Sequence, residues 1–361
     1  MSIKNLFLRH RVLLISVFIS LLLLRILLLN FPLLRNLDLE ISIVFSFVFS
    51  IITGFLGLYF FRKGESASSI IKIIYSLAFG LFITFLLIEI FFYSCPLTEG
   101  ILFFPLFVIT SSTFTLALSS ILKVFSKLKS ALFLFLIYIF LITYSLIEYY
   151  FESQLFLFNP LVIYFPGLVY NEIFEIDQRI LIYSFGLFFT SVLILSPKIL
   201  EEKQKRILQL ENYHFYILVV FISSFLFLLG DELGLSTSQK FFENKFPIKV
   251  ENQDFKIFFQ NKNISVRERK LFEYKTKFHF DWLYKIFGYK PSNVKIFIFD
   301  SDTSKKQLLG DEAADFTKPW LKQIFVTYNS FDQTIKHELA HIFLGEQTEN
   351  LFRVAAGFNL G

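Results

Sequence analysis

The residues with the clearest chemistry lie close to the end of the 361-residue chain, in the sequence T-I-K-H-E-L-A-H-I-F at positions 334–343. They form the pattern H-E-x-x-H, in which His337 and His341 are four positions apart. On an α-helix this spacing places the two imidazoles one above the other on one face, where both can bind a single Zn²⁺. Glu338 would then act as the general base that takes a proton from a metal-bound water. The pattern therefore predicts a hydrolytic zinc site.

The sequence around the motif predicts the helix that such a site requires. Ser330 and Gln333 have the spacing of a capping box at a helix start, and Gly345 is typical of a residue just past a helix end. Three apolar residues recur at helical spacing: Ile335, Leu339 and Ile342. They predict a buried face next to the histidine face.

The overall composition predicts a membrane protein. Hydrophobic residues make up 55% of the chain, and phenylalanine alone occurs 52 times. A soluble domain of ordinary composition does not need that much apolar surface. The single cysteine, Cys95, excludes a disulfide framework and a thiolate zinc cluster. The net charge of +5 does not indicate nucleic-acid binding, because the basic residues fall into short clusters between apolar segments.

Seven apolar segments have the length of membrane spans and predict a multi-span α-helical bundle over residues 1–230. The segments are residues 12–29, 41–61, 73–92, 101–122, 131–147, 180–195 and 213–229. The lipid bilayer is therefore the first predicted partner of this chain.

Basic residues are distributed unevenly between these segments. They precede the first segment and follow the second, fourth and sixth: Lys4, Arg9, Arg11, Arg62, Lys63, Lys72, Lys123, Lys127, Lys129, Lys198, Lys203, Lys205 and Arg206. The opposite loops contain only Arg35 and Arg179. The chain is therefore predicted to be an integral protein of the cytoplasmic (inner) membrane. The positive-inside rule predicts that its N-terminus lies in the cytoplasm. An odd number of spans places the chain after residue 229 on the extracytoplasmic side.

Two charged residues lie inside predicted spans, where a charge is a candidate for function. Arg25 in the first span and Glu89 in the third lie about 20 and 24 Å from the inner membrane surface, at a rise of about 1.5 Å per residue. We expect them to form a structural ion pair, with transport or proton relay as the alternative. The aromatic, proline-containing outer loop 151–178 is expected to lie in the interface and cover the bundle.

The composition changes at residue 230, and both signs of charge are interspersed over residues 231–361, as on a solvated globular surface. Alternating apolar residues predict strands at 254–260, 293–299 and 323–328. An amphipathic helix is predicted at 264–287 and a short one at 304–309, before the helix with the H-E-x-x-H motif. This order indicates an α+β domain.

The segment 254–361 resembles the catalytic half of a gluzincin metallopeptidase of the peptidase MA-like kind. The resemblance rests on the H-E-x-x-H motif, on the strand and polar turn I-F-I-F-D-S at 296–301, and on the small-residue segment A-A-D-F at 313–316. It implies a zincin-like fold, a zinc cofactor and a peptide or protein substrate. It also implies that the strand at 323–328 lies at the sheet edge and binds the substrate backbone by strand addition.

The chain departs from that family in one respect. Gluzincins take a third zinc ligand from a glutamate on a following helix, but Gly361 is only 20 residues beyond His341. Glu346 and Glu349 are expected to face solvent in a loop past Gly345, so we expect the chain to end before its third ligand and the domain to be incomplete at its C-terminus.

Two other functions remain open at this point. A membrane receptor or assembly factor with a degenerate protease-like domain would need no third ligand. A site-2-type intramembrane protease would place the zinc helix in the bilayer. The charged residues around that helix disfavour this: Asp332, Lys336, Glu346 and Glu349.

Overall fold

The computed structural model describes residues 3–92, 99–167, 176–201, 229–310, 315–348 and 350–353, and the chain divides into two compact units. Unit 1 comprises residues 1–147, 157–165 and 173–235. Unit 2 comprises residues 236–361 together with two earlier segments, 148–156 and 166–172. Unit 2 therefore includes the last turn of a long helix that begins in unit 1.

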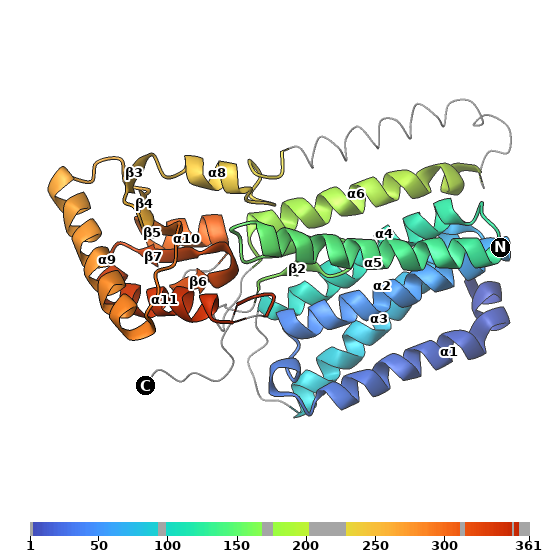
Figure 1. Ribbon diagram of the computed structural model, residues 1–361. Helices are drawn as coiled ribbons and strands as arrows, with labels where there is room; N and C mark the ends of the chain where they lie inside the picture. Colours follow the sequence, from blue (N-terminus) through green and yellow to red (C-terminus); the bar gives the residue numbers. More distant parts are fainter. Residues whose placement is uncertain are drawn as a thin grey trace. The chain divides into compact units, whose positions relative to one another are not determined.

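Unit 1 is a bundle of long apolar helices (Figure 1). The helices are α1 (Ile3–Leu28), α2 (Leu39–Arg62), α3 (Ala67–Phe92), α4 (Phe103–Leu122), α5 (Lys127–Phe151) and α6 (Gln178–Glu201), with short 3-10 turns at η1 (Pro32–Leu34) and η2 (Glu99–Leu102). Six helices among the described residues are long and apolar enough to cross a membrane, and they fit an integral membrane protein. The first six predicted spans are thus confirmed as helices, whereas nearly all of the seventh, 213–229, lies outside the described residues.

Small residues allow α2 and α4 to pack closely. A β-carbon at Gly57 of α2 would lie 3.0 Å from the side chains of Leu116 and Ser119 on α4, so the two helices approach each other closely at this glycine. The Ser119 hydroxyl on α4 donates to the carbonyl of Gly54 at 2.6 Å, and the hydroxyls of Ser46 and Ser111 lie 3.0 Å apart. These polar groups find hydrogen-bond partners on the neighbouring helix, as buried polar groups inside a helix bundle require.

The expected pair of intramembrane charges is confirmed. Arg25 Nη2 lies 3.9 Å from Glu89 Oε2, and the arginine side chain is fully buried. The guanidinium also donates to the carbonyls of Leu34 and Arg35, at 2.5 and 2.6 Å. Glu89 Oε2 accepts from the backbone N–H of Leu37 at 3.0 Å. Because both charges bind the backbone of the turn between α1 and α2, their contacts are those of a structural pair.

Part of the outer loop forms regular structure. Its strands β1 (Leu157–Asn159) and β2 (Ile163–Phe165) form an antiparallel hairpin that is buried within unit 1. The Ser46 hydroxyl donates to the carbonyl of Leu161 at 2.8 Å, and Asn159 Nδ2 donates to the Ser145 hydroxyl at 2.8 Å. Helix side chains thus satisfy polar groups of the hairpin, which allows it to be buried.

Unit 2 is an α+β unit around a five-stranded sheet of order β3-β4-β5-β7-β6. The strands are β3 (Ile248–Glu251), β4 (Phe255–Phe259), β5 (Val294–Phe299), β6 (Phe316–Lys318) and β7 (Gln323–Thr327). The helices are α8 (Gln239–Asn244), α9 (Val266–Phe287), α10 (Asp302–Leu309) and α11 (Phe331–Glu346), with a 3-10 turn η3 (Pro319–Leu321). The three central strands are parallel, and both edge strands are antiparallel to their neighbours.

Alternate residues of the central strands enter two separate cores. Ile296 of β5 and Ile324 of β7 are paired in register and pack with α9 and α11 on one face. Phe297 and Phe325, the next residues along, pack with α8 and α10 on the other face. The side-chain period of two in strands therefore produces a layer of helices on each side of the sheet.

The predicted strands at 254–260, 293–299 and 323–328 and the helix at 264–287 are confirmed as β4, β5, β7 and α9. One prediction about them is wrong: β7 pairs with β5 on one side and β6 on the other, so it is not an edge strand. The edge position next to it belongs to β6, which precedes β7 in the chain.

Candidate metal centre

Helix α11 carries the H-E-x-x-H motif and begins differently from the prediction. The side chain of Ser330 does not cap the helix; its hydroxyl accepts from the backbone N–H of Thr327 at 3.1 Å and lies 2.7 Å from the Thr327 hydroxyl. The predicted capping box is therefore absent, because Ser330 closes the turn from β7 instead. The predicted buried face is confirmed, since Ile335, Leu339 and Ile342 are all buried in the core beneath α11.

The end of α11 also differs from the prediction. Gly345 lies inside the helix, which ends at Glu346. A β-carbon at Gly345 would lie 2.8 Å from the β-carbon of Pro319 and 2.9 Å from the carbonyl oxygen of Arg353. Such distances are too short for carbon, so glycine is required here by close packing and not by a helix stop.

The structure brings the two histidines of the motif together. The Nε2 atoms of His337 and His341 lie 3.1 Å apart, and their rings are nearly perpendicular. Two zinc–nitrogen bonds at a tetrahedral angle separate the nitrogens by about 3.3 Å, given bond lengths of about 2.0–2.1 Å. The pair thus fits two ligands of one zinc ion. Without metal, the same separation allows one ring to donate a hydrogen bond to the other.

Electrostatics favours the form of His341 that binds metal. Burial lowers the pKa of His341, and the neighbouring His337 lowers it further. A lower pKa keeps the imidazole neutral at physiological pH, and only the neutral ring has a lone pair for a metal.

Glu338 lies on the same helix, with a side chain that is only about 5% exposed. Its Oε2 accepts a hydrogen bond of 2.7 Å from the hydroxyl of Thr317 on β6. Burial raises the pKa of Glu338 to about 7, an effect that the Thr317 bond opposes and the nearby Asp315 increases. A carboxyl group with a pKa near neutrality is suited to accept and return a proton.

Asp315 organises the turn beside Glu338. One of its oxygens accepts from Lys305 Nζ and from the backbone N–H of Thr327, both at 3.2 Å. The other accepts from the hydroxyl of Thr334 in the first turn of α11, at 2.6 Å. The sequence placed Asp315 only in a small-residue segment, and its link to α11 could not be read from spacing.

A third metal ligand is not found among the described residues. Within those ranges no group of three His, Cys, Asp or Glu side chains is gathered as a metal site. Glu346, expected to face solvent in a loop, is in the last turn of α11 and forms ion pairs with Lys322 at 2.7 Å and Arg353 at 3.2 Å. Glu349 lies outside the described residues.

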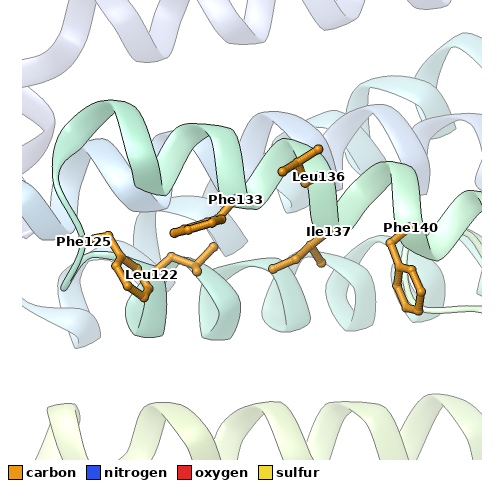
Figure 2. Close-up of a pocket in the computed structure, with 6 residues that line it drawn as sticks. All are labelled: Leu122, Phe125, Phe133, Leu136, Ile137 and Phe140. Carbon is orange, nitrogen blue, oxygen red and sulfur yellow. The ribbon is translucent and has the colours of Figure 1, made fainter.

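Unit 1 contains an apolar groove along the α4–α5 hairpin (Figure 2). It is lined by Leu122, Phe125, Phe133, Leu136, Ile137 and Phe140. None of these side chains can bind a metal or transfer a proton, so the groove has no catalytic chemistry. A groove of this kind on a membrane-length helix pair is suited to contact with lipid chains.

Comparison with known proteins does not identify a relative: no protein-family model, curated protein or solved structure matches this chain. Any assignment of function therefore depends on the geometry around α11.

Proposed function

We propose that this chain is a membrane-anchored zinc metallopeptidase whose residues 231–361 form a gluzincin-like domain with a zincin-like fold. The observation that carries the proposal is the 3.1 Å separation of the His337 and His341 Nε2 atoms on one helix. A buried glutamate between them in sequence, with its pKa raised to about 7 by burial, supplies the second part of a hydrolytic site.

In this proposal His337 and His341 would hold the zinc through their Nε2 atoms. Bound zinc would polarise a water molecule and the carbonyl of the scissile peptide bond. Glu338 would take a proton from the attacking water and later deliver it to the leaving nitrogen. Thr317 holds Oε2 of Glu338, which leaves Oε1 as the oxygen that accepts the proton. The two histidines supply two of the three protein ligands that a catalytic zinc ordinarily has.

The arrangement of the sheet supports a peptide as the substrate. The antiparallel edge strand β6 is next to α11, because Thr317 bonds to Glu338. We assign to β6 the role of pairing with an extended peptide, which the resemblance had given to residues 323–328. The charge bias of the loops in the sequence supports an extracytoplasmic position for this domain.

The main alternative is a non-catalytic receptor or assembly factor with a degenerate protease-like domain. The observation in its favour is the ion-paired state of Glu346, because its carboxylate already binds Lys322 and Arg353. An intramembrane protease of the site-2 type is disfavoured, because the membrane-length helices among the described residues do not include the 16-residue α11.

Metal content tests the proposal directly. The gene product, stripped with a chelator and dialysed against zinc, should retain zinc tightly, and both His337→Ala and His341→Ala should lose it. His279→Ala is the matched control, since His279 lies on α9 and its pKa is lowered mainly by burial there. Equal zinc content in all four proteins would contradict the assignment of the ligands.

A further inference from the structure

The edge strand β6 is short and is held on one side only. It has three residues, and its ladder partner is β7. A strand of this length forms too few ladder bonds to fix its own position firmly. Its successive side chains point to opposite faces of the sheet, so Thr317 faces α11 while Lys318 faces the other side.

Lys318 binds a part of unit 2 that is distant in sequence. Its side chain is almost completely buried, and Nζ donates to the backbone carbonyls of Tyr149, Glu152 and Gln154 at 3.1, 2.8 and 2.5 Å. The ring centroid of Tyr149 lies 4.6 Å from the same nitrogen. Three carbonyls match the three N–H groups of an ammonium ion, and the C-terminal end of a helix favours a cation.

The residue beyond the strand strengthens this attachment. Trp320 Nε1 donates to the carbonyl of Tyr150 at 2.7 Å, and the two rings are stacked with centroids 5.8 Å apart. Residues 149–154, at the end of α5, therefore receive two side-chain donors from the stretch 318–320.

Thr317 connects β6 to the candidate general base, Glu338, through its hydroxyl. Its hydroxyl lies 2.7 Å from Oε2 of Glu338 and 3.2 Å from the backbone carbonyl of the same residue. Any displacement of β6 thus moves the group that orients the carboxylate.

We infer that β6 positions the general base: Lys318 anchors the strand to residues 149–154, and Thr317 on the anchored strand orients the carboxylate of Glu338. Both are positioning residues: their side chains act on the strand and on Glu338, whereas a paired peptide would contact only the backbone of β6. The inference rests on the proposed function for its catalytic consequence, whereas the anchoring itself does not depend on catalysis.

The first test compares two replacements of Thr317 in the zinc-loaded, purified gene product with quenched fluorogenic peptides as substrate. Thr317→Val keeps the shape but removes the hydroxyl, and should lower kcat about tenfold or more with KM and zinc content unchanged. Thr317→Ser restores the hydroxyl and should recover most of the rate. A Val variant as fast as wild type, or a Ser variant as slow as Val, would overturn the positioning role.

The second test needs no activity. Hydrogen exchange of the metal-free protein should show faster deuterium uptake at 149–154 and 316–318 in Lys318→Met, with α9 unchanged. Unchanged uptake at both segments would overturn the anchor. Lys318→Gln keeps two N–H donors, so its deuterium uptake should fall between that of wild type and that of Lys318→Met. It replaces Lys318→Met in the test if that variant does not fold.

A double mutant tests whether Thr317 and Lys318 act through the same group. Because both residues act through Glu338, kcat of Thr317→Val/Lys318→Met should be close to that of the slower single variant, and independent losses would overturn the link. A wild type that binds zinc and hydrolyses no peptide would overturn the proposed function together with the role of Thr317. The exchange experiment would still decide whether Lys318 anchors β6.

Discussion

Burial and hydrogen bonds distinguish two acidic side chains of α11: Glu338 in the middle of the helix and Glu346 in its last turn. Glu338 is buried, has one hydroxyl donor and has a raised pKa, which suits a group that exchanges protons. Glu346 is partly exposed and lies between two cations, Lys322 and Arg353. Its ion pairs suit a structural role near the end of α11.

Replacement of Glu346 should therefore leave the metal in place. Glu346→Gln is expected to keep the zinc content of wild type and to lose roughly 0–1 kcal/mol of stability, since its pairs are partly exposed. Metal analysis and thermal unfolding measure the two effects, with His341→Gln as the control that loses zinc. Loss of zinc from Glu346→Gln would identify it as the missing ligand.

Lys318 should make stability depend on pH. Burial lowers its pKa from 10.5 to about 7, partly opposed by Glu152. Between about pH 7 and 10.5 the unfolded chain then binds more protons at this lysine than the folded protein does, so its contribution to the free energy of unfolding rises with pH. The melting temperature of wild type relative to Lys318→Met should increase over that range, and a constant difference would contradict the lowered pKa.

At the scale of elements, long segments with regular apolar spacing were predictable, and short or polar ones were not. The strands β4, β5 and β7 and the helix α9 repeat apolar residues often enough to be recognised. The edge strand β6 has three residues, one of them a buried lysine, so its sequence does not resemble a strand. Strand order depends on contacts between distant residues, which explains why β7 was wrongly placed at the edge.

The candidate site was likewise predictable only in part. The pair of histidines was predictable, because a spacing of four on a helix fixes their distance. Thr317 and Asp315 were not, because they reach Glu338 and Thr334 from positions 21 and 19 residues earlier in the chain. Such contacts follow from how β6 packs against α11, and no local pattern reveals them.

Close packing of α11 gives a prediction at this scale. Gly345→Ala places a methyl group against Pro319 and the backbone of Arg353, which should destabilise unit 2 by about 1–3 kcal/mol. Gln347→Ala, at the exposed end of the same helix, is the control and should change stability little. Equal melting temperatures for the two variants would show that the close approach is not rigid.

The buried pair of Arg25 and Glu89 connects α1 and α3 with the turn between α1 and α2. Arg25→Met or Glu89→Gln alone leaves one buried charge without its partner and should reduce the yield of folded protein. The double variant should recover much of the yield. Additive losses in the double variant would show that the two residues act separately.

At the scale of the whole molecule, six membrane-length helices among the described residues fit an integral membrane protein, and the proposed zinc chemistry lies in the α+β unit. The charge bias of the loops predicts on which side of the membrane that chemistry occurs. A reporter that is active only outside the cytoplasm, fused after Glu232, should be active. Activity of a cytoplasmic reporter at the same position would reverse the proposed orientation.

The central claim is that Glu338 moves the proton for a zinc-dependent peptide hydrolysis, and one comparison tests it most directly. Zinc content and peptide hydrolysis should be measured together for the purified gene product and for Glu338→Gln, which keeps the size and position of the side chain. We predict equal zinc in both proteins and a loss of kcat of about a hundredfold or more in the variant. A Glu338→Gln protein that binds zinc and hydrolyses peptides at the wild-type rate would contradict the account.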